Sequence, residues 1–344
     1  MAFTNINKSS DHFTTHIYTG SNSAPNAQTG IGHQPDSVWI KPRNLANSHR
    51  WHSTLLTAPD YYVMPENTDA EATNDNCITS FNSDGFTLGN TDNGWNGNYN
   101  YVSWNWKANG QGSSNTDGSI NTTYTSANTT SGFSMVKYTG TGSNATVGHG
   151  LGVAPKVVMI KNLARAENWL VGHSSLGFTK FLSIDITNAA QTTSNRFNDT
   201  APTSTVFSVG TSDGSNKSGD SFIAYCFAEK AGFFSAGSYK GGGNADGSFV
   251  QTNFRPSMVI IKNYETTDQW QMFDSKRGIN GAMGFVYPDS HEAETATVPM
   301  DIYSNGFKFR DTSQARNGTN YDFIYMAWAE APIVGSNNVP CTAR

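Results

Sequence analysis

The sequence has few charged residues and only three cysteines. Charged side chains make up 14% of the 344 residues, against about 25% in an average soluble protein. Aromatic residues nevertheless reach 12%, whereas disordered chains are poor in them. Cys77, Cys226 and Cys341 show no Cys-X-X-Cys spacing, so neither a disulfide framework nor a structural zinc site is indicated. Abundant Ser, Thr, Asn and Gly favour turns, and Thr and the aromatics favour strands, which predicts a β-rich chain.

The sequence also lacks a basic stripe and any long apolar run. Its formal net charge is -5 and no Lys/Arg cluster is present, so we expect no nucleic-acid partner. No stretch of about 20 apolar residues exists, so we expect no membrane insertion. The first residues lack the apolar core of a signal peptide, and we expect the chain to be made in a cytosol.

Catalytic and metal-binding motifs are missing as well. There is no Gly-X-Ser-X-Gly, no His-Glu-X-X-His and no phosphate-binding loop of the usual spacing. His49 and His52 are three residues apart, but no third metal ligand can be named, which favours a surface or loop role. Acidic residues recur only at Glu229 and Glu330, just past a predicted strand. We therefore predict no catalytic residue, no metal, no cofactor and no enzymatic activity.

The sequence does contain an internal repeat. A Tyr-X-Gly tripeptide occurs three times, and after each occurrence a proline introduces an apolar run that ends in lysine. The tripeptides are Tyr18-Thr19-Gly20, Tyr138-Thr139-Gly140 and Tyr239-Lys240-Gly241. The runs are Pro35–Lys41, Pro155–Lys161 and Pro256–Lys262. Both features are separated by the same intervals, 120 and then 101 residues, which indicates three diverged copies of one unit.

Further features recur in the same order within each copy. Single tryptophans follow the apolar runs, and we align Trp51, Trp169 and Trp270 with one another. A phenylalanine comes later in each copy, at Phe86, Phe207 and Phe307. An aromatic strand closes each copy, at Tyr101–Trp106, Phe222–Phe227 and Phe323–Trp328.

These intervals predict the domain organisation. We expect an N-terminal arm at residues 1–10, repeats at 11–108, 132–231 and 232–332, and a C-terminal tail at 333–344. Residues 109–131 are rich in Gly, Ser, Thr and Asn and account for the extra length after the first copy, which is typical of a linker. We expect the first repeat to be more loosely attached and the last two to form a tight pair.

Each repeat has the pattern of short strands between polar turns. The run Val38–Ile40 and its counterparts are continuous apolar segments that suit the inside of a sandwich. Asp84-Gly85 and Asn305-Gly306 indicate tight hairpins, and no segment shows sustained helical periodicity. The fold class predicted is all-β, with three tandem antiparallel β-sandwich repeats of the jelly-roll kind.

Aromatic residues in polar stretches of the first repeat are the candidate binding residues. They are Tyr61, Tyr62, Trp95 and Tyr99, which have no counterparts in the other copies. Sandwich loops often present such rings to glycans or protein partners. The alternative, which we favour, is that they cover core edges or subunit contacts. If one repeat contacts the outside world, we expect it to be the first.

Three segments of the second copy resemble a known family. The segments Phe133–Gly140, Val147–Pro155 and Ile223–Glu229 resemble an uncharacterised repeat-domain family of virion structural proteins in marine tailed phages, including those that infect cyanobacteria. The resemblance implies a non-enzymatic protein on the phage particle, either a tail fibre or adhesin or a head decoration. The implied partners are other virion proteins, further copies in a homo-oligomer such as a trimer, and a host surface glycan.

Two alternatives to a virion protein made in the bacterial cytoplasm stay open. One is a lectin-like carbohydrate-binding module that acts without a particle. The other is a β-sandwich glycan depolymerase, whose paired carboxylates would come from separate strands.

Overall fold

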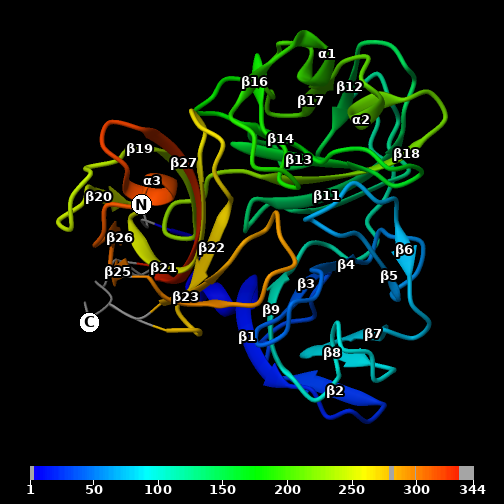
Figure 1. The fold of residues 1–344 in the computed structure, drawn as a ribbon. Coiled ribbons are helices and arrows are strands. Elements are labelled where there is room, and N and C mark those ends of the chain that lie inside the picture. Colours follow the sequence, from blue (N-terminus) through cyan, green and yellow to red (C-terminus); the bar gives the residue numbers. More distant parts are fainter. Residues whose placement is uncertain (1–3, 279–282, 299, 333–344) are drawn as a thin grey trace.

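The computed structural model describes residues 4–278, 283–298 and 300–332 of the chain. Its described residues form antiparallel β-sheets with only three α-helices, each of four residues. The all-β prediction is therefore confirmed. Three lobes lie around a common centre, coloured blue to cyan, green, and yellow to red in Figure 1. The predicted tail at 333–344, with Cys341, lies outside the described residues.

The first lobe follows a short 3-10 helix, Ser9–Asp11. Its strands are β1 (Phe13–Thr19), β2 (Asn26–Thr29), β3 (Ser37–Pro42), β4 (Arg50–Ser53), β5 (Tyr61–Tyr62), β6 (Ala72–Thr73), β7 (Ile78–Asn82), β8 (Gly85–Leu88) and β9 (Asn100–Trp106). They form a large sheet in the order β1-β9-β3-β4, a small sheet β2-β8-β7 and the pair β5-β6.

The second lobe contains two of the helices. Its strands are β10 (Tyr124–Asn128), β11 (Phe133–Thr139), β12 (Ala145–Gly148), β13 (Val157–Asn162), β14 (Leu170–His173), β15 (Lys180–Phe181), β16 (Gln191–Thr192), β17 (Val206–Val209) and β18 (Ser221–Phe227). The helices are α1 (Ser194–Phe197) and α2 (Asp213–Asn216). The large sheet has the order β10-β11-β18-β13-β14, and β12-β17 and β15-β16 are two-stranded.

The third lobe repeats this plan with a longer large sheet. Its elements are β19 (Phe234–Lys240), β20 (Phe249–Gln251), β21 (Phe254–Asn263), β22 (Gln271–Asp274), β23 (Met283–Val286), β24 (Thr295–Val298), β25 (Met300–Tyr303), β26 (Gly306–Phe309), α3 (Gln314–Asn317) and β27 (Asp322–Pro332). The large sheet is β19-β27-β21-β22-β23-β24, and the small sheet is β20-β26-β25.

The three large sheets share one strand order. Four strands recur in it, as β1-β9-β3-β4, β11-β18-β13-β14 and β19-β27-β21-β22. In each of them the first of these four strands pairs with the aromatic closing strand, which pairs in turn with the apolar strand after the proline. The recurrence in the sequence thus corresponds to a recurrence of sheet topology.

The Tyr-X-Gly tripeptide has a physical reason. Each tyrosine hydroxyl donates a hydrogen bond to a backbone carbonyl in the turn before the closing strand. The pairs are Tyr18 with Trp95, Tyr138 with Ser215 and Tyr239 with Arg316, at 2.9, 2.6 and 2.7 Å. A Cβ on the glycine would lie 1.9–2.3 Å from a carbonyl oxygen of that turn, at Gly20, Gly140 and Gly241. Only glycine fits such a close approach of two backbones.

The alignment of Trp51 with Trp169 and Trp270 is wrong. Strand pairing places Ile40 opposite Arg50, Ile160 opposite Leu170 and Ile261 opposite Gln271. The residue preceding each of these partners is equivalent, so His49 corresponds to Trp169 and Trp270. The alignment matched tryptophan with tryptophan. The constant interval of eight residues from the recurring lysine gives the correct equivalence with His49.

The predicted linker is not a linker. Within residues 109–131, β10 extends the large sheet of the second lobe through five residue pairs with β11. The first repeat is not loosely attached either, because Trp51 stacks on Tyr225 with ring centroids 4.0 Å apart. A Ser/Thr-rich composition suits an edge strand as well as a flexible segment, so composition alone could not separate them.

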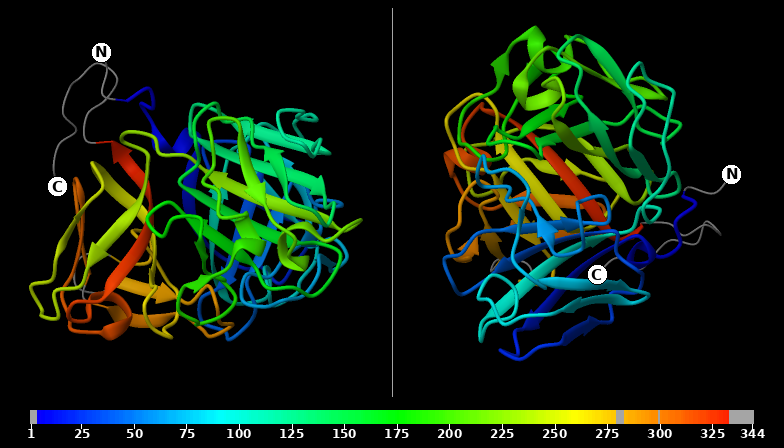
Figure 2. Two further views of the ribbon diagram at one scale, coloured as in Figure 1. Left: turned by 90° about the horizontal axis from the view of Figure 1, so that it is seen from above. Right: turned by 90° about the vertical axis from the view of Figure 1, so that its right-hand side faces the viewer.

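Each large sheet has two apolar faces. One face packs on the small sheet of the same lobe, around residues such as Val38 and Phe86 in the first lobe and Val158 and Phe207 in the second. The other face points to the middle of the molecule, where one continuous cluster takes residues from all three lobes. Figure 2 shows the three sheets converging on that centre.

Six aromatic rings close the centre in a cyclic pattern. Equivalent residues Trp106, Phe227 and Trp328 contact one another, with centroids 5.3–6.4 Å apart. A phenylalanine at the start of each lobe packs against the closing aromatic of its own lobe and of one neighbour. These pairs are Phe13 with Trp106 and Trp328, Phe133 with Phe227 and Trp106, and Phe234 with Trp328 and Phe227. The lobes thus follow one another head to tail, and the third closes on the first.

We predict that Trp328→Ala destabilises all three lobes together. Removing a buried tryptophan leaves a cavity and costs about 3–5 kcal/mol, and this ring contacts all three lobes. Guanidinium unfolding with hydrogen exchange resolved by lobe measures the effect. Val153→Ala, at an exposed residue, is the control and should change stability by less than about 0.5 kcal/mol. Wild-type exchange protection in the first two lobes would contradict a shared core.

Candidate functional site

The predicted binding aromatics are packed rather than presented. Trp95 is 0% exposed and its indole Nε1 donates to Asn90 Oδ1 at 2.5 Å. Tyr62 is also buried, and the guanidinium of Arg50 lies over its ring at 4.8 Å and over Trp95 at 5.9 Å. The prediction that Tyr62 and Trp95 stack on a ligand is therefore wrong, because other side chains of the protein already cover these rings.

Tyr61 and Tyr99 are partly buried and lie in different clusters. Tyr61 packs on the central cluster and Tyr99 on the core of the first lobe. The structure therefore does not bring the four predicted aromatics together as one exposed binding surface. Their contacts agree with the alternative interpretation from the sequence, in which these aromatic residues cover core edges.

The surface or loop role expected for His49 and His52 is wrong, because both side chains are buried, and His49 also contacts the third lobe. His49 Nδ1 accepts a hydrogen bond from the Trp39 indole at 2.8 Å, and its Nε2 lies 3.0 Å from the Tyr287 carbonyl oxygen. His52 Nδ1 lies 3.0 Å from the Tyr61 carbonyl oxygen. Burial lowers the pKa of both imidazoles, that of His52 to about 3. Among the described residues, no group of three or more His, Cys, Asp or Glu side chains could hold a metal ion.

A surface hollow lies where the first lobe meets residues 109–111. Two adjoining depressions of about 380 and about 200 Å³ share Gln34, Asp36 and Gly110. The larger one also contacts the loop around Thr57 and the half-buried ring of Phe81. Polar side chains, backbone groups and one aromatic ring thus line an open groove.

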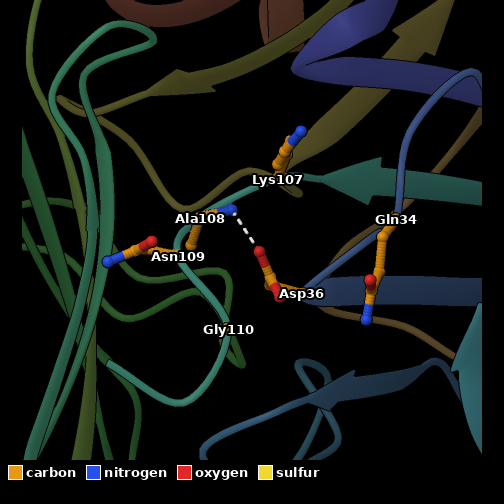
Figure 3. A pocket seen from close by; sticks show the side chains of 6 residues that line it. All are labelled: Gln34, Asp36, Lys107, Ala108, Asn109 and Gly110. Carbon is orange, nitrogen blue, oxygen red and sulfur yellow. Dashed lines mark hydrogen bonds between the residues drawn. The ribbon is translucent and has the colours of Figure 1, made fainter. Parts of the chain in front are cut away.

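Asp36 is fixed at the floor of this groove. Its Oδ2 accepts a hydrogen bond from the backbone N–H of Ala108 at 2.7 Å, the dashed line in Figure 3. The residue is 4% exposed, and burial raises the pKa of its carboxyl group. Lys107, Asn109 and Gln34 surround it from the rim. The carboxylate therefore holds the strand exit after β9 in place.

Three recurring lysines are the most distinctive buried groups. Lys41, Lys161 and Lys262 end the apolar strands and are 0% exposed. Each ammonium donates to a backbone carbonyl of the neighbouring lobe. The acceptors are His291 for Lys41 at 3.3 Å, Thr68 for Lys161 at 2.8 Å and Thr187 for Lys262 at 3.0 Å. Burial lowers the pKa of each lysine to about 8.

A second set of three equivalent residues also makes contacts between the lobes, and each lies eight residues after the recurring lysine. His49, Trp169 and Trp270, equivalent by strand register, each reach a backbone carbonyl of the neighbouring lobe. The acceptors are Tyr287 at 3.0 Å, Met64 at 2.9 Å and Ser183 at 2.9 Å. An acidic residue of the same lobe accepts from the backbone N–H of each, namely Glu66, Asp185 and Asp289. Burial raises the pKa of these acids, to about 6 for Asp185 and about 7 for Asp289.

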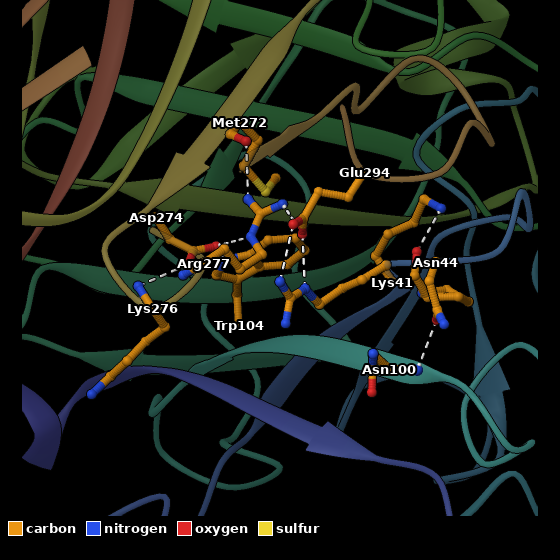
Figure 4. Close-up of polar contacts among 11 residues, drawn as sticks. Lys41, Asn44, Asn100, Trp104, Met272, Asp274, Lys276, Arg277 and Glu294 are labelled. Carbon is orange, nitrogen blue, oxygen red and sulfur yellow. Dashed lines mark hydrogen bonds and ion pairs between the residues drawn. The ribbon is translucent and has the colours of Figure 1, made fainter. Parts of the chain in front are cut away.

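The junction between the third and first lobes carries an additional ion network, drawn in Figure 4. Arg43 forms a bidentate pair with Glu294 at 2.8 and 3.0 Å. The guanidinium of Arg277 pairs with both Glu294, at 3.2 Å, and Asp274, at 2.6 Å. The side chains of Arg277 and Asp274 are 0% exposed. The Trp104 indole donates to the same Asp274 carboxylate at 3.1 Å. Every charge here is paired across or beside the junction, as buried charges require.

Sequence reasoning missed these inter-lobe groups. The recurring lysine was visible at the end of each apolar run, and an uncompensated lysine after three buried residues is itself unusual. The acids at 66, 185 and 289 were hidden because one is Glu and two are Asp. Nothing in the sequence shows which carbonyls the lysines reach, because those carbonyls belong to another lobe.

Residues 8–332 match the family described as a domain of unknown function, DUF7483. The match spans all three lobes, and the chain belongs to this family. No curated protein matches the chain. In the described part of the chain, no helix is long and apolar enough to cross a membrane.

We predict that acid weakens the junction between the second and third lobes through His173. Its Nε2–H donates to the Tyr325 carbonyl and its Nδ1 accepts from the Ser175 N–H, so the neutral ring is required. Burial lowers its pKa to about 4, against about 6.5 in an unfolded chain. The unfolded state thus binds more protons between these values, and stability falls as the pH drops from 6.5 toward 4.

His173→Gln tests this pH dependence, because its amide offers the same donor and acceptor without titrating. From pH 7 to pH 4 the variant should lose up to about 3 kcal/mol less unfolding free energy than the wild type. Urea unfolding at several pH values measures the difference. The other buried histidines and acids titrate alike in both proteins, so equal losses would contradict the role of His173.

Proposed function

We propose that this chain is a non-enzymatic structural protein on the surface of a phage particle, as part of a tail fibre or a head decoration. The main observation behind the proposal is that buried ionisable groups hold the three lobes together. Lys41, Lys161 and Lys262 each hold a neighbouring lobe through its backbone. Buried polar groups of this kind fix a rigid arrangement rather than a reacting centre.

The cyclic closure supports the same proposal. One chain has the arrangement that three subunits form in a cyclic trimer, with a core common to all lobes. Such a unit keeps its shape without depending on protein concentration, which suits a component exposed outside a cell. The resemblance of the repeat motifs to marine tailed-phage virion proteins supplies the biological context.

Carbohydrate binding is the second candidate, favoured by the groove beside Asp36. Its lining combines the exposed amide of Gln34, the hydroxyls of Thr54 and Thr57, and the ring of Phe81. Polar groups that fix hydroxyls next to one ring face are the usual means of holding a sugar. On a particle surface this groove would contact host glycans.

The particle assignment predicts that the chain copurifies with virions. Antibodies raised against the purified protein should label intact particles from a lysate in immunogold electron microscopy. Mass spectrometry of gradient-purified particles should find the chain at a fixed ratio to the major capsid protein. A chain found only in the soluble fraction of the lysate would contradict the proposal.

A mutant phage that lacks the gene separates the two candidates. Loss of particle stability or shape supports the structural role. Normal particles that lose adsorption, together with binding of host glycan to the purified chain that Phe81→Ala weakens, favour the carbohydrate candidate. Thr79→Ala, on the same strand but outside the groove, is the matched control.

A further inference from the structure

Residues 109–131 cover one side of the second lobe. Strand β10 pairs with β11, and the N–H of Thr123 donates to the Lys137 carbonyl at 2.8 Å. Further back, the N–H of Ile120 donates to the Thr146 carbonyl of β12 at 3.0 Å. The segment therefore occupies the outer edges of both the large and the small sheet of this lobe.

The covering segment fits tightly. Ile120 is 6% exposed and belongs to the apolar core of the second lobe. A Cβ on Gly118 would lie 2.4 Å from the Thr146 carbonyl oxygen, and one on Gly148 would lie 1.7 Å from Asn115 Oδ1. This side of the second lobe is thus shaped to bind an extended segment that carries one aliphatic side chain.

The first and third lobes leave the same side open. The equivalent edge strands are β1 and β2 in the first lobe, and β19 and β20 in the third. Each is at the end of its sheet, and no strand among the described residues pairs with its outer edge. We call these two surfaces the open sides. An unpaired edge presents a row of free N–H and C=O groups, which is a template for another strand.

Exposed apolar side chains mark both open sides. The large hydrophobic residues exposed among those described are Ile17, Val153 and Phe249. Ile17, 42% exposed, is on β1, and Phe249, 45% exposed, is on β20. Two of the three are therefore on edge strands of open sides.

These two residues occupy the positions at which the second lobe receives its covering segment. Ile17 precedes the recurring tyrosine as Lys137 does, and Lys137 accepts from Thr123. Val250 pairs with Phe307 as Val147 pairs with Phe207, so the preceding Phe249 corresponds to Thr146. Thr146 accepts from Ile120. The exposed apolar residues of the open sides thus lie at the positions that bind the covering segment in the second lobe.

We infer that each open side binds an extended segment of a separate polypeptide by strand addition, in the manner of residues 119–128 in the second lobe. The partner segment is uncharged and rich in Ser, Thr and Asn, with one aliphatic residue in the place of Ile120. Main-chain hydrogen bonds supply affinity, and the aliphatic side chain sets the register. This inference does not rest on the proposed particle role.

The chemistry of the partner follows from the native segment. Residues 119–128 read Ser-Ile-Asn-Thr-Thr-Tyr-Thr-Ser-Ala-Asn and contain no charge. All five residues of β10 are buried or half-buried in the second lobe. A charged side chain at those positions would lose hydration without gaining a partner.

A fluorescent peptide with the sequence of residues 119–128 tests the inference. We expect saturable binding to the full-length chain by fluorescence anisotropy, with two sites, and no binding by a scrambled peptide of the same composition. Hydrogen exchange should show new protection in β1 and β19. Equal binding of the scrambled peptide, or protection confined to β11, would overturn the inference.

Two sets of variants locate the site. Lys137 faces β10, so the equivalent Ile17 and Ser238 turn their N–H groups outward, and proline there leaves the pairing with β9 and β27 intact. Ile17→Pro combined with Ser238→Pro should weaken peptide binding at least about tenfold, the value of one or two hydrogen bonds per site. Val153→Pro, at the third exposed apolar residue, is the matched control and should bind normally.

Ile17→Asp combined with Phe249→Asp repeats the test without proline. This pair keeps the backbone donors and removes the two exposed apolar side chains that a bound segment would cover, so binding should again weaken. Melting temperatures near that of the wild type establish that each variant is folded. A folded variant of either set with wild-type affinity would overturn the inference.

Discussion

The structure depends on the burial of three apolar sheet faces against one another. Each large sheet is apolar on both sides, and its small sheet covers only one of them. A separate lobe would expose a patch that includes Trp51, Trp104 and Trp106 in the first copy, which a soluble domain does not tolerate. The lobes therefore form one body, and the rings around Trp328 are where all three faces meet.

The buried polar groups follow from this arrangement. Where one lobe crosses to the next, loops bring backbone carbonyls such as those of Thr68 and Thr187 into the interior without a strand partner. Buried carbonyls need donors. These two accept from the backbone N–H groups of Glu167 and Asp268, and the recurring lysines donate to the same oxygens. The low pKa of each lysine and the high pKa of Asp185 and Asp289 record the cost of that burial.

The same cyclic plan makes the differences between lobes informative. Among the described residues only the second lobe carries a covering strand, and the open sides of the other two expose Ile17 and Phe249. The junction of the third and first lobes carries the paired network around Arg277. A symmetric interior with unequal outer surfaces suits a unit whose lobes meet different neighbours.

The sequence by itself determined what each lobe does locally. Tyr-X-Gly recurs because the hydroxyl bond and the glycine approach are made within one lobe, and alternating turns and aromatic strands determine the all-β class. Tertiary structure alone decided the rest. It buried Trp95, made a strand of a Ser/Thr-rich segment, and put His49 in the place of a tryptophan, because register and inter-lobe contact depend on residues distant in the chain that composition and spacing do not reveal.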